Sequence, residues 1–171
     1  MPEKKTLGRA HAAKRQGKSG STQAGAFVKE QIDHVREGKH GLRSTKQAIA
    51  IGLSEARRSG VDLKAPKKGS TSEATRRKAK TDSDAGHGKK HTAGTAESSA
   101  KRSTATKRAL KREGSEGASS KALSKQSHAS ASRRSASDRS EAAKKGVKTK
   151  GTSARSQAAR KAAHTRAARA H

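Results

Sequence analysis

The positive charge of this chain is distributed very unevenly, and its large apolar residues lie where the charge is lowest. Residues 64–171 contain 29 Lys and Arg against 8 Asp and Glu, whereas residues 21–63 contain 7 against 5. The same low-charge segment holds ten of the fifteen Val, Ile, Leu, Met and Phe residues. Because burial of large apolar side chains is the dominant favourable term in folding, only this short segment has the composition of a folded core. The remainder has the composition of a polycation.

The apolar content of the whole chain is low for a core of ordinary size. Only 27% of the 171 residues are hydrophobic, one is aromatic, and the mean hydropathy is −1.12. Ordering a residue costs about 1–2 kcal/mol of backbone entropy, and residues 64–171 offer little besides Leu110, Leu123 and Val147 to offset it. We therefore expect a mostly disordered chain with a small all-α helical hairpin near the N-terminus, and at most short Ala/Lys/Arg helices in the tail.

Composition divides the chain into three expected regions: a basic flexible arm (1–20), the hairpin (21–63) and a basic low-complexity tail (64–171). The tail carries three short repeats, each with a serine, then Glu or Gln, alanine, a pair of basic residues and a final threonine. The copies lie at 72–81, 140–149 and 156–165. Each has a serine cap and helix-favouring alanines but is too short to hold a helix alone. We expect a bound polyanion to favour the helical form.

The hairpin segment carries helix signals at both of its expected helices. Apolar residues recur at helical spacing over 22–37, and Gly38 supplies a stop. A second helix is predicted over 44–58, where Ser44 and Gln47 have the spacing of a capping box. Two short helices bury little surface, and the chain contains no cysteine. Self-association is the remaining source of stability, so we expect a homodimer through residues 21–63.

The charge of +28 indicates a polyanionic partner, and nucleic acid is the most abundant one inside cells. Modules that read single strands stack bases on aromatic rings, and this chain has only Phe27. The expected partner is therefore double-stranded DNA, bound by phosphate neutralisation with little sequence preference, RNA being the alternative polyanion. No apolar run resembles a signal peptide or a membrane span. We expect no membrane partner and a cytoplasmic, nucleoid-associated protein.

The connector between the two predicted helices has the composition of an anion site. Its glycines permit tight turns, and helix N-terminal amides together with neighbouring cations suit a DNA phosphate. A solvated turn, or a helix-turn-helix that places 44–58 in the major groove, are the alternatives. With the basic pairs elsewhere, the candidate nucleic-acid-binding residues are Arg36, Lys39, His40, Arg43, Ser44, Thr45, Lys46, Gln47, Arg57, Arg58, Lys67, Lys68, Arg76, Arg77, Lys144, Lys145, Arg160 and Lys161.

No pattern in the chain indicates catalysis, a cofactor or a metal. There is no G-x-S-x-G elbow and no nucleotide-binding P-loop. His87 and His91 have helical ligand spacing, but Gly86 and Gly88 oppose a helix there and nearby lysines repel a cation. His34 is expected to be a surface residue. We expect a non-enzymatic protein without catalytic or metal-binding residues.

Residues 23–61 carry the motif REGKHG followed by RSTKQAIAIGLS and a later ARR. This stretch resembles a bacterial family of small basic proteins classed as a domain of unknown function. Members are often labelled plasmid stabilisation or DNA-binding proteins, so the resemblance implies a role of that kind, and it places the important positions at 36–41 and 43–47. In composition alone, the tail is similar to the tails of linker histones.

Two other functions fit the same charge pattern. The chain would serve as an RNA-associated or ribosome-associated basic chaperone if its charge acts on structured RNA. It would serve as a protein-interaction module if residues 21–63 dock a partner and the tail only localises the complex.

Overall fold

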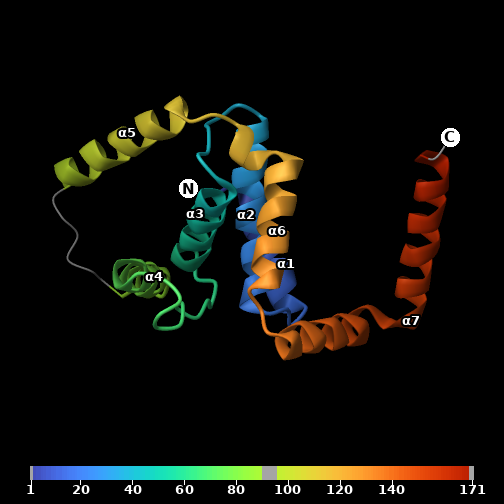
Figure 1. Ribbon diagram of the computed structural model, residues 1–171. Helices are drawn as coiled ribbons and strands as arrows, with labels where there is room; N and C mark the ends of the chain where they lie inside the picture. Colours follow the sequence, from blue (N-terminus) through green and yellow to red (C-terminus); the bar gives the residue numbers. More distant parts are fainter. Residues whose placement is uncertain (1, 90–95, 170–171) are drawn as a thin grey trace. The chain divides into compact units, whose positions relative to one another are not determined.

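The computed structural model describes residues 2–89 and 96–169 (Figure 1). The chain divides into two compact units, Met1–Gln126 and Ser127–His171. The first unit contains α1, α2, α3, α4, α5, a single 3-10 turn η1 and the start of α6; the second contains the rest of α6 and α7. Their bounds are α1 Lys4–Arg15, α2 Gly20–Arg36, α3 Thr45–Arg58, α4 Glu73–Gly86, α5 Ala96–Arg112, η1 Glu116–Ala118, α6 Ser120–Ser132 and α7 Ala136–Arg169.

The expectation of a mostly disordered chain with one small helical hairpin is wrong. Helices occupy most of the described residues, including the segments expected as a flexible arm and as an intrinsically disordered tail. The entropy argument counted only large apolar side chains. It left out the high helix propensity of Ala, Lys and Arg, which are abundant in the tail, and the burial of small residues at close helix contacts. The hairpin is also covered, since α1 packs on α2 and α4 packs on α3.

The two predicted helices of the hairpin are confirmed to within two residues at each end, as α2 and α3. Ser44 caps α3 by accepting a hydrogen bond from the backbone N–H of Gln47. The return bond of the predicted capping box is displaced by one residue, because Gln47 Oε1 accepts from the N–H of Arg43 at 2.9 Å. Gly60, with φ of 80°, follows the end of α3 in the conformation typical of a helix C-terminus.

Two small apolar clusters hold the first unit together. The larger one centres on Phe27, whose side chain is completely buried between α1, α2 and α3. Its buried members are Ala10, Ala24, Phe27, Ala56 and Val61. The second cluster lies at the other end of α2 and includes a residue of η1; its members are Val35, Leu42, Ala48 and Ala118. Most of these residues are small, which lets the helices approach closely.

The three repeat copies lie in α4 and α7. The copy at 72–81 forms most of α4, begins at the Ser72 cap and buries Ala79. The other two copies belong to α7, on either side of Gly151, whose φ of 69° and ψ of 171° interrupt the helix. Val147 of α7 is exposed. No helix in the described part of the chain combines the length and apolar character needed to cross a membrane.

Candidate nucleic-acid interface

The connector between α2 and α3 is paired with the segment that follows α5. The backbone N–H of Gly41 donates to the carbonyl of Leu110 at 2.9 Å, and that of Leu42 donates to the carbonyl of Gly114 at 2.7 Å. A side chain on residue 41 would collide with the backbone of Glu113. The amides of Gly41 and Leu42 are therefore occupied within the chain and are not offered to an anion.

The first turn of α3 divides its candidate residues between the interior and solvent. Thr45 is buried, and its Oγ1 donates a 2.7 Å hydrogen bond to the carbonyl of Gly117 in η1. Ser44 and Gln47 serve as caps. Lys46 is exposed. Of these four, only Lys46 presents a cation to solvent at the start of the helix.

Two arginines flank this turn and differ in their partners. Arg36 donates from Nε to the carbonyl of Ala118 at 3.3 Å, which helps to hold η1 against α2. Arg43 has 82% of its side chain exposed and lies 3.4 Å from Glu113. An exposed ion pair of this kind contributes little to stability, so Arg43 can exchange its carboxylate partner for a phosphate at small cost.

The C-terminal end of α3 and the start of α4 hold a second set of candidate residues. Arg57 is buried, which lowers the pKa of its guanidinium, and it donates to the carbonyl of Lys64 at 3.5 Å. Arg58 is half-exposed, 3.8 Å from Asp82. Arg76 lies 3.3 Å from Glu73. Lys67, Lys68 and Arg77 are exposed.

The third set belongs to the second unit, where Lys144, Lys145, Arg160 and Lys161 all lie exposed on α7. Gly151 separates the first two from the last two. Residues 127–171 contain 12 Lys and Arg against 2 Asp and Glu. Because the rise of an α-helix is about 1.5 Å per residue, the cations of α7 are spread over two helical segments of roughly 20–30 Å each.

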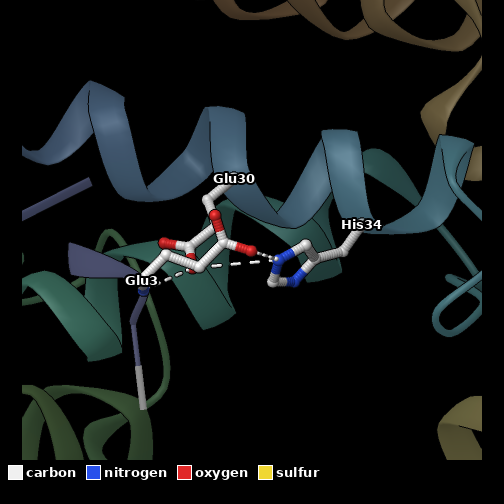
Figure 2. A group of neighbouring side chains, drawn as sticks. All are labelled: Glu3, Glu30 and His34. Carbon is white, nitrogen blue, oxygen red and sulfur yellow. Dashed lines mark hydrogen bonds and ion pairs between the residues drawn. The ribbon is translucent and has the colours of Figure 1, made fainter. Parts of the chain in front are cut away.

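A cluster that the sequence analysis missed lies where the N-terminus of α1 meets α2 (Figure 2). The side chains of Glu3, Glu30 and His34 point toward one another, with His34 Nε2 at 3.0 Å from Glu3 Oε1 and 3.8 Å from Glu30 Oε1. Glu30 and His34 are one turn apart on α2, a spacing visible in the sequence. Glu3 joins them only through the packing of α1.

Lys39 connects this cluster to the connector. Its ammonium lies 2.9 Å from Glu37 and 3.2 Å from Glu3. Hydrogen bonds to Glu37 and then to Glu3 raise the pKa of Lys39, and the bonds from His34 and Lys39 lower the pKa of Glu3. His40 lies beside His34, with ring centroids 6.0 Å apart and the rings edge to face. Lys39 and His40 therefore face the acidic cluster, whereas Arg43 and Lys46 face solvent.

Comparison with known proteins gives a family match that covers α2, α3 and the connector between them. Residues 10–69 match the family of unknown function DUF6496. The DUF6496 region extends from the second half of α1 through α2 and α3 to the turn before α4. It includes the stretch 23–61 on which the family resemblance was based, and the resemblance to a family of unknown function is confirmed. No curated protein and no solved structure matches the chain.

The limits of the DUF6496 region separate the candidate residues into two groups. The connector, Arg57 and Arg58 lie inside it, and so do Glu30 and His34 of the acidic cluster. Glu3 and the cations of α7 lie outside it. The matched region thus contains α2 and α3, and α7 lies outside it.

Proposed function

We propose that this protein binds double-stranded DNA without enzymatic activity and largely without sequence preference, by neutralising phosphates, as a nucleoid-associated or plasmid-maintenance protein. The observation that carries the proposal is α7, a long helix with a break at Gly151, whose described basic side chains are exposed and whose one large apolar residue, Val147, is also exposed. A helix of this composition has no apolar face that could pack on a hydrophobic core. Its dense positive charge is best matched by a polyanion.

The geometry of α7 suits phosphates more than base edges. Lys144 and Lys145 are consecutive, as are Arg160 and Lys161, so each pair projects in two directions about 100° apart around the helix. Cations on several sides of one helix can contact phosphates of both strands. Sequence readout needs side chains placed together against base edges, and pairs that project in different directions do not present such a set on one face of the helix.

The first unit supplies a folded anchor with exposed basic side chains of its own. Arg43 and Lys46 are exposed at the start of α3, close in sequence and free of burial. Thr45 and Arg57 are engaged in the interior, and we assign them structural roles. The proposed contacts of this unit are electrostatic, and most of the affinity is assigned to α7.

A homodimer through residues 21–63 remains a prediction. The argument for it was that a bare hairpin lacks enough burial, and α1, α4 and η1 supply burial of that kind within one chain. Sedimentation equilibrium of the full chain at micromolar concentration decides the matter. A mass near 17.9 kDa would exclude the dimer.

The test is a salt titration of DNA binding by the full chain, measured by fluorescence anisotropy on two duplexes of unrelated sequence. One variant changes Lys144, Lys145, Arg160 and Lys161 to Gln, and its control changes the exposed Ala142, Ala143, Ala158 and Ala159 of the same helix to Gln. Each lost phosphate contact reduces the magnitude of the slope of log K against log salt by about 0.9. The slope of the fourfold variant is therefore expected to be shallower by up to about 3.6.

The expected result is a steep slope for the unmodified chain and the control, equal for both duplexes, and a shallower slope for the fourfold variant. A wild-type affinity in that variant, together with loss of binding when Arg43 and Lys46 are changed to Gln, would refute the assignment to α7. Competition at fixed salt decides between DNA and the RNA alternative. If structured RNA displaces the bound DNA preferentially, RNA and not DNA is the partner.

A further inference from the structure

The acidic cluster at the start of α1 contains three side chains of the types that bind metal ions. Its two carboxylates and one imidazole place ligand atoms within 4.8 Å of one another. The Nε2 of His34 lies 3.0 Å from Glu3 Oε1 and 3.8 Å from Glu30 Oε1. In a tetrahedral zinc site with bonds of about 2.0–2.1 Å, neighbouring ligand atoms are about 3.4 Å apart. Both measured separations lie close to that value.

The charge of Glu30 is poorly compensated. Its side chain is 3% exposed, and among the described residues His34, at 3.8 Å, supplies its only ion-pair contact. Oε1 accepts a 2.8 Å hydrogen bond from the backbone N–H of Glu3, but Oε2 is buried and has no hydrogen-bond partner. A buried carboxylate without a matching cation is costly. A bound cation is the ligand that would remove this cost.

Entry to the cluster is open on one side. Glu3 and Glu30 line a cavity of about 120 Å³, and half of the Glu3 side chain is exposed. Lys5, Arg9 and Lys29 also line the cavity, and Lys29 pairs with Asp33. The acidic groups are thus reached from solvent through Glu3, while Glu30 closes the inner end.

We propose that Glu3, Glu30 and His34 bind one divalent transition-metal ion, with Zn²⁺ as the best chemical match. Imidazole and carboxylate together suit Zn²⁺ better than Mg²⁺ or Ca²⁺, which prefer oxygen ligands alone. Three protein ligands leave a fourth position for water. The site is separate from the proposed DNA contacts of α7 and does not depend on them.

The bound ion would fasten the N-terminus of α1 to the C-terminal half of α2. Glu3 is the N-cap residue of α1, and Glu30 and His34 lie on successive turns of α2. Any ligand that binds only the folded state raises its stability. The consequence is that Zn²⁺ stabilises the packing of α1 on the DUF6496 region.

Lys39 competes with the ion, which gives a distinctive test. Its ammonium is 3.2 Å from Glu3 Oε1, and Lys39 keeps its ion pair with Glu37 when the contact with Glu3 is broken. Removing this cation by Lys39→Met frees the Glu3 carboxylate and lowers the local positive charge. Lys39→Met is therefore expected to tighten Zn²⁺ binding several-fold, an effect that a purely structural ion network would not produce.

The experiment titrates ZnCl₂ into the full chain, freed of metal and nucleic acid, by isothermal titration calorimetry, and repeats the titration with Co²⁺ to observe the visible absorption of a tetrahedral site. Thermal unfolding is followed with Zn²⁺ and with EDTA. The loss variants are Glu30→Gln and His34→Gln. The controls are Asp33→Asn, which removes a carboxylate from the same cavity, and His128→Gln, which removes an exposed histidine of α6.

One equivalent of Zn²⁺ should bind, and it should raise the melting temperature. Glu30→Gln and His34→Gln should each weaken binding by at least about tenfold, as expected for loss of one ligand in three, with both controls unchanged. Glu30→Gln also removes the uncompensated buried charge, so its metal-free form should remain folded by circular dichroism. Absence of binding, or binding that neither loss variant weakens, would overturn the proposal.

Discussion

Ser54 on α3 donates a 2.6 Å hydrogen bond to Oδ2 of Asp82 on α4, across a separation of 28 residues. The other carboxylate oxygen of Asp82 is 2.5 Å from the ammonium of Lys78 and 3.8 Å from Arg58. The Asp82 side chain is 3% exposed. This buried carboxylate therefore fixes the first repeat helix on the hairpin by polar contacts, with Ala79 as its buried apolar neighbour.

Asp82→Ala should detach α4 from α3. The substitution leaves the Ser54 hydroxyl without its acceptor and two cations without their shared carboxylate, at a cost of about 2–4 kcal/mol in the free energy of unfolding. Urea denaturation followed by circular dichroism measures the change. Asp84→Ala is the matched control, since Asp84 pairs with Lys89, whose side chain is 73% exposed, and should cost less than about 1 kcal/mol. Equal losses in the two variants would contradict the assigned role of Asp82.

The helices α2 and α3 approach each other closely at Gly52. A Cβ added there would lie 2.7 Å from the backbone of Val28, with no flexible side chain to move aside. Gly52→Ala should therefore force the two helices apart and destabilise the protein by about 1–3 kcal/mol. Gly25→Ala on α2 is the opposite case, because a Cβ at that position meets nothing within 4 Å. It should stabilise by about 0.5–1 kcal/mol through helix propensity alone. Thermal melts of the two variants should shift in opposite directions.

Glu55 should make stability fall as pH rises. Burial, and next the negative charge of Glu30, raise the pKa of Glu55 above its usual value of 4.5, against a lowering by its hydrogen bond from Gln31. A carboxyl group whose pKa is higher in the folded state stabilises that state fully below pH 4.5, and this contribution is lost as pH rises through the raised pKa.

Glu55→Gln tests this dependence, because the amide oxygen can still accept from Gln31 and no charge develops. The variant should be more stable than the unmodified chain at pH 7, and the difference should shrink as pH falls toward 4.5. Urea midpoints at a series of pH values provide the measurement. A constant difference across that range would show that the effect is one of packing.

Gly151 should act as the break that keeps α7 in two segments. Its φ of 69° and ψ of 171° belong to a region that is essentially restricted to glycine. Gly151→Ala is expected to extend helical conformation through the break and to increase the circular dichroism signal at 222 nm. Gly146→Ala, in a helical position of α7 with open space around it, is the control. The increase should be larger for Gly151→Ala, and equal increases would argue against a conformational break.

Sequence patterns predicted α2 and α3 because the signals for these helices are local. The apolar spacing, the Ser44 cap and the glycine that follows α3, Gly60, each act within a few residues. Neighbouring residues in the sequence are therefore sufficient to place the helix ends. The docking of α1, α4 and η1 was missed for a different reason. Their buried residues include Thr6, Ala79 and Gly117, whose small or polar side chains do not form an apolar stripe.

By itself, the sequence determined the charge distribution, the ends of α2 and α3 and the resemblance to a family of unknown function, because these depend on composition and on residues close together in the chain. Only the tertiary structure decided which polar groups meet. Glu3 reaches His34 across 31 residues, and Ser54 reaches Asp82 across 28. Such contacts arise from the packing of helices on one another, and no local periodicity encodes them.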